Sequence, residues 1–322
     1  MKKLFVYIIA FLAFPLVTIG QKNSTEKKQV KSVMVFEKNN RYQKQITIGL
    51  AGSDTVTIYL SNGVKDVVIL SSEYAYYAYN THKFDQPTIS ATMVGKNITA
   101  MDCNANINSG GITNLDISKN AALEELSCWG SGLTSLDVSK NTKLTMLKCN
   151  QNELTNLDVS KNTALVKLYC HENELSSLDV SKNTALTELF CGNVLGKNKL
   201  TSLDVSKNTK LTILNCEYNP LKDLDVSKNT VLKELYCNNN QLKDLDVSKN
   251  TKLIKLDCSR NNLSEEALNA LFKTLHNNHT EDKKIIFVYG NPGAKTCDKT
   301  IAEEKGWEVI VNKEQNDKNI RR

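Results

Sequence analysis

The hexapeptide LDVSKN occurs six times in this chain, and the variant LDISKN occurs once before them. The seven copies begin at residues 115, 136, 157, 178, 203, 224 and 245, so that the interval between copies is constant except for one longer step after 178. Self-similarity at such a period indicates a repeat architecture, in which each unit completes its core by stacking on its neighbours. The repeat therefore predicts a stack of like coils.

Cysteines recur between the hexapeptides at nearly the same period. Eight of the nine lie in one row, whose interval is constant except for longer steps before Cys128 and Cys216: Cys103, Cys128, Cys149, Cys170, Cys191, Cys216, Cys237 and Cys258. One cysteine per coil in a constant slot favours a buried packing position over metal or redox chemistry, since CxxC pairs and interleaved histidines are absent from the sequence. Neighbouring parallel strands, about 4.8 Å apart, exceed the usual reach of a disulfide, so we expect free thiols. Cys297 lies outside the row and has no assigned role.

The two halves of each unit share one pattern. Aligned on cysteine, the copies read LxxLxCxxNxL, and the segments around LDVSKN read LxxLxVxxN. The first pattern resembles the leucine-rich repeat, with Cys where Leu usually stands. The nested form, with two such patterns in one short unit, resembles exported bacterial leucine-rich-repeat proteins of the internalin-like and Bacteroides types. The resemblance covers residues 98–263, about half of the chain.

We therefore expect a leucine-rich-repeat solenoid that is mostly β. A coil as short as Leu136 to Asn156 cannot hold a strand, a substantial helix and two turns, so both sides should be extended and the strands parallel and in register. Alternate side chains then face inward, such as Leu126 and Cys128 on one side and Leu136 and Val138 on the other. Asn amides at the corners should bond to backbone that lacks a strand partner.

The segment before the repeats divides into three parts. Residues 1–20 carry two lysines, an apolar run and small residues before Gln21, the pattern of a secretory signal peptide; an uncleaved membrane anchor is the alternative. Residues 21–32 form a polar linker. Residues 33–96 contain short β-rich runs and are expected to be an N-terminal β cap that closes the first coil, while the solenoid spans 97–263.

The segment after the repeats changes its period. Residues 264–311 predict a small C-terminal α/β cap, in which Ser264 caps a helix with apolar residues at helical spacing, followed by a strand, a short helix and a last strand. This ending also resembles the C-terminal caps of exported bacterial leucine-rich-repeat proteins. Residues 312–322 are predicted to be a disordered tail.

Charge and motif content exclude several classes of function. The net charge is +6, and its 41 basic residues are spread through the repeats, so no concentrated patch predicts nucleic-acid binding. The Asp of each LDVSKN has a Lys three positions later, which favours a solvated face of alternating charge over calcium binding. His171 with Glu172 and Glu217 is the one outward acid–base group that the pattern assembles, and an open sheet is a poor place to exclude water. We therefore predict no enzyme, no cofactor and no metal.

The outward slots of the Cys-bearing strands vary from coil to coil, unlike those of the LDVSKN side. The candidate ligand-binding residues in these slots are Trp129, Tyr169, His171, Phe190, Glu217, Tyr236 and Asp257. Tyr169 and Phe190 occupy the same slot in adjacent coils and should stack. Exposed aromatic residues in polar surroundings are typical of protein interfaces and of sugar binding, although an open sheet also favours such rings for their β-propensity. Two four-residue insertions, around 104–111 and at 194–197, are expected to form loops that frame the site.

Together these features predict a secreted, non-catalytic interaction module that binds a protein ligand through the variable strand face. A glycan-binding module that uses the same aromatic face is the alternative. The resemblance implies adhesion or contact with host or other cell surfaces. We expect a monomer that is secreted, periplasmic or at the cell surface, with no membrane insertion once the signal peptide is removed.

Overall fold

The structure is a computed structural model. It describes residues 32–39, 45–52, 55–60, 65–69, 75–80, 88–95, 97–103, 112–193 and 199–312. All of them belong to one compact unit, Lys31–Arg322. The predicted signal peptide, the polar linker before Ser32, both insertions and the predicted tail after Asn312 lie outside the described residues. The predicted domain boundaries stay predictions.

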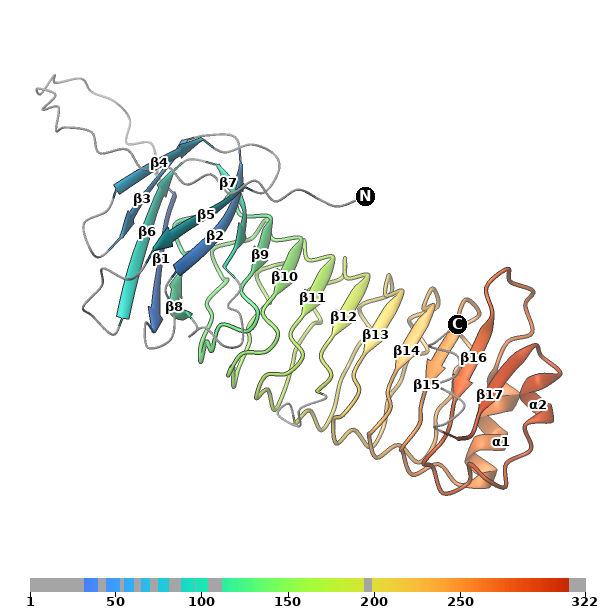
Figure 1. Ribbon diagram of the computed structural model, residues 1–322. Coiled ribbons are helices and arrows are strands. Elements are labelled where there is room, and N and C mark those ends of the chain that lie inside the picture. The colour runs from blue at the N-terminus through green and yellow to red at the C-terminus, as the bar shows by residue number, and fades with distance from the viewer. Residues whose placement is uncertain are drawn as a thin grey trace, which may run out of the picture. The chain divides into compact units, whose positions relative to one another are not determined.

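A long sheet of parallel strands runs through the repeats (Figure 1). Its parallel strands are β7 (Ile98–Asp102), β9 (Glu125–Ser127), β10 (Met146–Lys148), β11 (Lys167–Tyr169), β12 (Glu188–Phe190), β13 (Ile213–Asn215), β14 (Glu234–Tyr236), β15 (Lys255–Asp257), β16 (Lys284–Phe287) and β17 (Trp307–Ile310). Each strand pairs in register with the next, so that the equivalent positions of successive repeats lie side by side. The predicted solenoid of parallel, in-register strands is confirmed.

The core of the solenoid is built from the residues that the repeat holds constant. In the coil of β11, Leu168 and Cys170 are fully buried, and Leu157 and Val159 are buried on the preceding LDVSKN side, where Asp158 between them is exposed. Both sides therefore alternate as extended backbone does. Burial of this apolar surface is the main force that holds one coil against the next.

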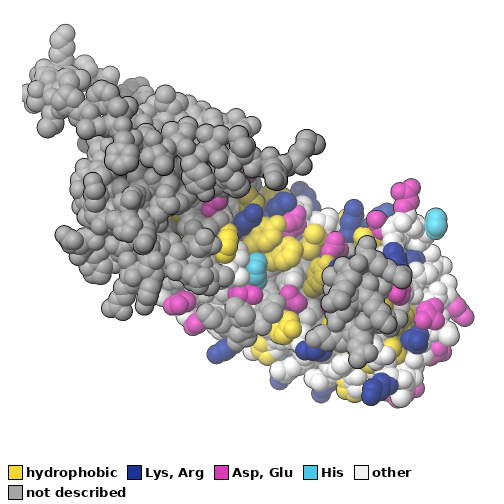
Figure 2. Space-filling model, viewed as in Figure 1, with side chains coloured by type: hydrophobic (Ala, Val, Ile, Leu, Met, Phe, Trp, Pro, Cys, Tyr) yellow, Lys and Arg dark blue, Asp and Glu magenta, His cyan; other side chains and the backbone are white. Residues whose placement is uncertain are grey.

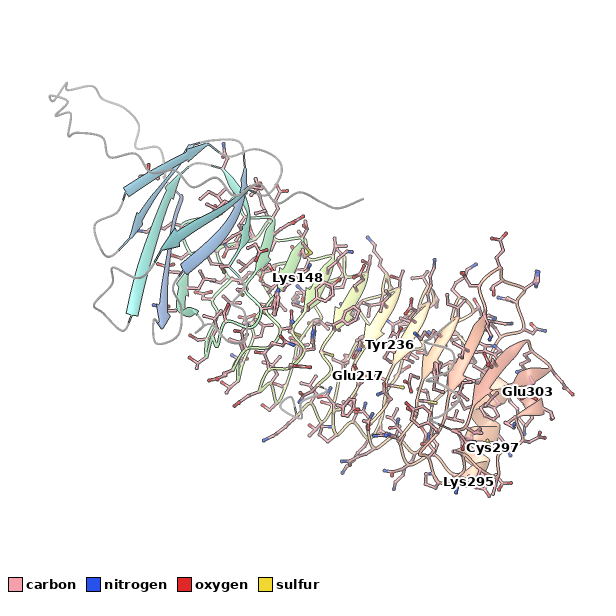
Figure 3. All side chains as sticks on the ribbon, in the orientation of Figure 1. Lys148, Glu217, Tyr236, Lys295, Cys297 and Glu303 are labelled. Carbon is pink, nitrogen blue, oxygen red and sulfur yellow. The ribbon has the colours of Figure 1, made fainter. Side chains whose placement is uncertain are left out.

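The cysteine row fills a packing position of this core. All nine cysteines are free and buried. Burial raises the pKa of the Cys149 and Cys191 thiols to about 12, because a thiolate would lose its hydration there. Cys297 lies apart from the row, in the C-terminal segment (Figure 3).

Two rows of asparagine amides tie each coil to its neighbour. Asn173 donates from Nδ2 to the carbonyls of Cys149 and Cys170 at 2.9 and 3.1 Å and accepts from the Leu154 amide at 3.1 Å. On the other side of the coil, Asn162 donates to the carbonyls of Val138 and Asn141, both at 2.9 Å. The predicted role of the corner amides is confirmed. The LDVSKN side is thus linked by side chains, whereas the Cys-bearing side is linked both by a backbone ladder and by its asparagine row.

The Asp of each LDVSKN is exposed and bonds to its own turn. Asp158 Oδ1, for example, accepts from the Ser160 amide at 2.8 Å, and this hydrogen bond is the main cause of the lowered pKa of its carboxyl. The same bond recurs at the other hexapeptides. The charge of Lys161, three positions later, lowers the pKa of Asp158 by less.

Strands from the N-terminal region cover the first coil. β2 (Gln45–Gly52) pairs antiparallel with β7 on one side and with β5 (Ala75–Asn80) on the other. A second sheet has the order β4 (Lys65–Ile69), β3 (Thr55–Leu60), β6 (Thr88–Gly95), β1 (Ser32–Asn39) and β8 (Ile112–Asp116). The edge of β7 is thus paired, which confirms the predicted β cap and protects an edge that could recruit other chains.

The C-terminal region combines two helices with the end of the parallel sheet. α1 (Glu265–Thr274) begins after Ser264, whose side chain accepts from the Ala267 amide at 3.2 Å, as the sequence predicts. α2 (Thr300–Glu303) precedes β17. Leu268, Leu271 and Phe272 of α1 are buried in the common core, so this helix covers the last coils.

The first strand after α1 is a degenerate repeat that the sequence reading missed. In β16, Ile286 pairs with Leu256, and the following Val288 occupies the slot of a cysteine. Asn291 accepts from the amides of Asn261 and Leu263, both at 3.1 Å, and donates to the carbonyls of Cys258 and Val288 at 2.9 and 2.8 Å. This is the bonding of a repeat asparagine, so the cap supplies the partner that the last regular coil needs.

Candidate functional site

The variable side chains project from the sheet face formed by β10 to β15. Hydrophobic side chains gather on this face with acidic and basic side chains around them (Figure 2). Lys148, Glu217 and Tyr236 lie on it along the stack of coils (Figure 3). Because the strands are in register, residues from distant parts of the sequence become neighbours across this face.

Tyr169 and Phe190 form the centre of the aromatic surface. Their rings stack with centroids 5.0 Å apart and an interplanar angle of 19°, which confirms the predicted stack. The Tyr169 hydroxyl donates to the Glu188 carboxylate, which also accepts from Lys167 Nζ at 2.8 Å. Partial burial, followed by this carboxylate, raises the pKa of Tyr169. The pair is therefore held in a fixed arrangement by contacts within the protein.

His171 lies beside this pair, at the edge of a hollow. Its ring centroid is 6.3 Å from that of Phe190, and the ring planes are tilted by 58°. Burial lowers the pKa of His171, and the opposing effect of Glu217 is smaller, so the imidazole is neutral at neutral pH. The hollow has a volume of about 180 Å³ and is lined by His171, Glu172, Phe190, Gly192, Asn193, Asn215 and Glu217.

Two amides fix the Glu217 carboxylate at the other side of the hollow. Asn215 Nδ2 donates to Oε1 and Asn238 Nδ2 donates to Oε2, both at 3.0 Å. Asn215 Oδ1 in turn accepts from the Glu217 amide at 3.2 Å. The three side chains come from two successive coils and form one hydrogen-bonded group.

Tyr236 and Asp257 form a second group further along the face. The Tyr236 hydroxyl donates to Glu234 at 2.5 Å, and Lys255 Nζ lies 5.1 Å from the ring centroid. Asp257 Oδ1 accepts from the Ser259 hydroxyl and amide at 2.6 and 3.0 Å, while burial raises the pKa of its carboxyl. Asn215 stands between Phe190 and Tyr236 in the strand register, so the predicted aromatic cluster is divided into two parts.

Trp129 is partly exposed and belongs to the coil of β9, two strands before Tyr169. The structure thus brings Tyr169, His171, Phe190 and Glu217 together at one place and sets Trp129 and the Tyr236–Asp257 pair on either side of it. That these residues bind a ligand stays a prediction. The two insertions expected to frame the site lie outside the described residues.

Gly192 is the residue whose role the sequence reading missed. It occupies the slot after Cys, and a Cβ atom there would lie 2.4 Å from Asn215 Oδ1 and 2.8 Å from Glu217 Cγ. A side chain at this position would therefore displace the Asn215–Glu217 arrangement and fill the hollow. The signal for it was a single glycine in a slot that otherwise carries Trp, Asn, His, Glu or Ser.

The described ranges contain neither a metal-binding cluster nor a membrane-spanning helix. No group of three or more His, Cys, Asp or Glu side chains there is arranged to hold a metal ion. No helix of the same residues has the length and apolar content needed to cross a bilayer.

The in-register strands, the buried Leu and Cys rows and the asparagine rows define a leucine-rich-repeat solenoid. The solved leucine-rich repeat domain of APL1B matches it with a TM-score of 0.50 at 18% sequence identity, over 65% of this chain and 63% of that one. This likeness supports the fold alone.

Two proteins of Listeria monocytogenes are also similar to this chain. The functional domain of InlJ, described as including a cysteine ladder, is 36% identical over 64% of this chain and 47% of that one, with a TM-score of 0.48. Internalin C2 is 20% identical over 52% of this chain and 74% of that one, with a TM-score of 0.44. The chain thus spans about half the length of the InlJ domain. No protein-family model and no curated protein sequence matches the chain.

Proposed function

We propose that this protein is a non-catalytic interaction module that binds a protein ligand through the outward face of β10 to β15. The observation that carries the proposal is the fixed Tyr169–Phe190 stack. Leu168 and Leu189 in the same strands are already fully buried, so the core does not need these rings. Rigid aromatic side chains in polar surroundings contribute much of the binding energy in protein interfaces.

A protein ligand suits this face better than a glycan. Each ring of the stack covers one face of the other, which leaves less flat ring surface for a sugar. The candidate residues extend from the coil of β9 to that of β15, and six steps of about 4.8 Å span on the order of 30 Å, a length suited to a protein surface. A glycan ligand remains the alternative, supported by the Glu217 and Asp257 carboxylates near the rings.

We infer further that the module acts outside the cytoplasm. The apolar segment after Lys2 and Lys3, with its features of a signal peptide, supports export. Adhesion, or contact with host or other cell surfaces, is the role that fits an exported solenoid with one varied face.

The test uses the double variant Tyr169→Ala/Phe190→Ala, with Thr155→Ala/Asn156→Ala as a matched control on the exposed side of the coil. The immobilised chain is presented with surface extracts, and each captured protein is purified and its affinity measured. Loss of two anchors should weaken binding by about 2 kcal/mol or more, roughly 30-fold, whereas the control should bind like the wild type. If the double variant binds the captured protein with the affinity of the wild type, the proposed binding face is wrong. Specific binding on a glycan array, with no protein partner captured, would favour the glycan alternative.

A further inference from the structure

The hollow beside Phe190 presents the carboxylate of Glu217. Within the described part of the chain, Glu217 takes part in no ion pair, although two amides orient it. Each of its oxygens accepts from one amide, and a carboxylate oxygen has two lone pairs. Glu217 therefore keeps one acceptor site on each oxygen, which is the arrangement that a forked donor requires.

A second carboxylate adds to the negative charge of the hollow. Glu172 is buried with 9% of its surface exposed, and its Oε2 atom has no hydrogen-bond partner among the described residues. Its backbone has a φ of 55°, a left-handed conformation that directs the chain around the corner next to His171. An unpartnered carboxylate oxygen that is out of contact with water is costly unless a donor arrives from elsewhere.

Two aromatic rings, those of His171 and Phe190, form part of the wall of the hollow. Tyr169 covers one face of the Phe190 ring, and on the other side the next strand places Asn215 beside Phe190. Phe190, the neutral His171 ring and Gly192, which has no side chain, therefore border the same volume as Glu217. A planar cation can stack on such rings while it bonds to the carboxylate.

We propose that this hollow receives an arginine side chain of the protein ligand, whose guanidinium forms two parallel hydrogen bonds with Glu217 and stacks against Phe190 and His171. The inference rests on the proposed function and names the chemistry of its central contact. Arginine fits better than lysine because its planar fork matches both free acceptor sites of Glu217, whereas an ammonium group is a compact point charge.

The experiment measures binding of a single-residue probe to the full chain by NMR. N-acetyl-arginine amide is titrated into the labelled protein and compared with the citrulline amide, which keeps the shape but has no charge, and with the lysine amide. We expect saturable shifts at the backbone amides of Gly192 and Glu217, with about tenfold weaker binding of citrulline and intermediate binding of lysine. Equal binding of citrulline, or no localised shift at about 50 mM probe, well above millimolar affinities, would overturn the inference.

Two variants test the role of the carboxylate. Glu217→Gln should weaken arginine binding about tenfold, because it removes the charge and one acceptor. Glu174→Gln is the matched control: it makes the same change at an exposed glutamate of the neighbouring segment that does not line the hollow, and it should bind like the wild type. The comparison of arginine and citrulline binding to the wild-type protein still tests the proposal if Glu217→Gln disturbs the fold. Unchanged binding by Glu217→Gln would contradict the proposal.

The two proposals fail in different ways. If a captured protein ligand is lost with Tyr169→Ala/Phe190→Ala but binds Glu217→Gln with wild-type affinity, the arginine contact is wrong and the binding face stands. If that ligand binds both variants with wild-type affinity, the proposal that this face binds the ligand is wrong.

Discussion

Replacement of Asn173 by Ala tests whether the asparagine rows hold the solenoid together. The side chain is fully buried, so water cannot take over its hydrogen bonds. Its removal leaves the Leu154 amide without the acceptor at 3.1 Å and deprives the Cys170 carbonyl of a donor at 3.1 Å. The Cys149 carbonyl is less affected, because Asn152 Nδ2 also donates to it at 2.9 Å.

The expected loss follows from these three contacts. A buried amide left without a partner costs about 1–3 kcal/mol, and a lost hydrogen bond at a carbonyl costs about 0.5–1.5 kcal/mol. Asn173→Ala should therefore lower the free energy of unfolding by about 2–4 kcal/mol. Asn156→Ala, at an exposed asparagine at the end of the preceding coil, is the control and should change it by less than about 0.5 kcal/mol.

Urea unfolding followed by far-UV circular dichroism measures both variants. With a slope of about 3 kcal/mol per molar urea, the midpoint of Asn173→Ala should fall by about 1 M. Hydrogen exchange of the Leu154 amide gives a local readout, because this amide should lose protection in the variant. A midpoint equal to that of Asn156→Ala, with the Leu154 amide still protected, would refute the assigned role of the asparagine rows.

Three further results are expected. The thiols of Cys149 and Cys191, whose pKa burial raises to about 12, should resist alkylation at pH 8 in the native protein and react after denaturation; rapid native labelling would contradict the inward-facing row. Burial raises the pKa of Asp257 above its ordinary 3.8, so the native state holds this proton more tightly, and the contribution of Asp257 to stability should fall as pH rises through and above that value. The stability of the wild type relative to Asp257→Asn, from urea titrations, should therefore be lower at pH 7 than at pH 4, and an equal difference at both pH values would contradict the assignment. Ser264→Ala should cost about 1 kcal/mol in thermal unfolding, since Ser264 caps α1, and no loss would show that this cap contributes little.

The fold could be predicted because the repeat constrains it directly. A fixed period with Leu126 and Cys128 in constant slots leaves few ways to bury both, and the stack follows from that requirement. The helix after Ser264 could also be predicted, since its N-cap residue and the spacing of its apolar residues are local signals. The degenerate repeat at β16 was missed because Val288 replaces the cysteine and hides the pattern, although Asn291 keeps its place.

The site could be predicted only in part. Register alone places Tyr169 against Phe190, since both occupy one slot in adjacent coils. The hollow instead depends on Gly192, Asn215 and Asn238, which come from three coils and whose contacts no single repeat reveals. Gly192 has no side chain that would signal a contact in the sequence, and its importance becomes evident only from the positions of Asn215 and Glu217 in the folded protein.

Asn291 has a consequence for how such a protein can change in length. Because Asn291 of the closing segment makes the same four bonds as the internal Asn152, the closing segment completes the coil before it in the same way as another repeat would. Whole units can therefore be gained or deleted between the two ends by duplication or recombination of the gene, without redesign of either terminus. Each such event would lengthen or shorten the ligand-facing surface by one step of about 4.8 Å.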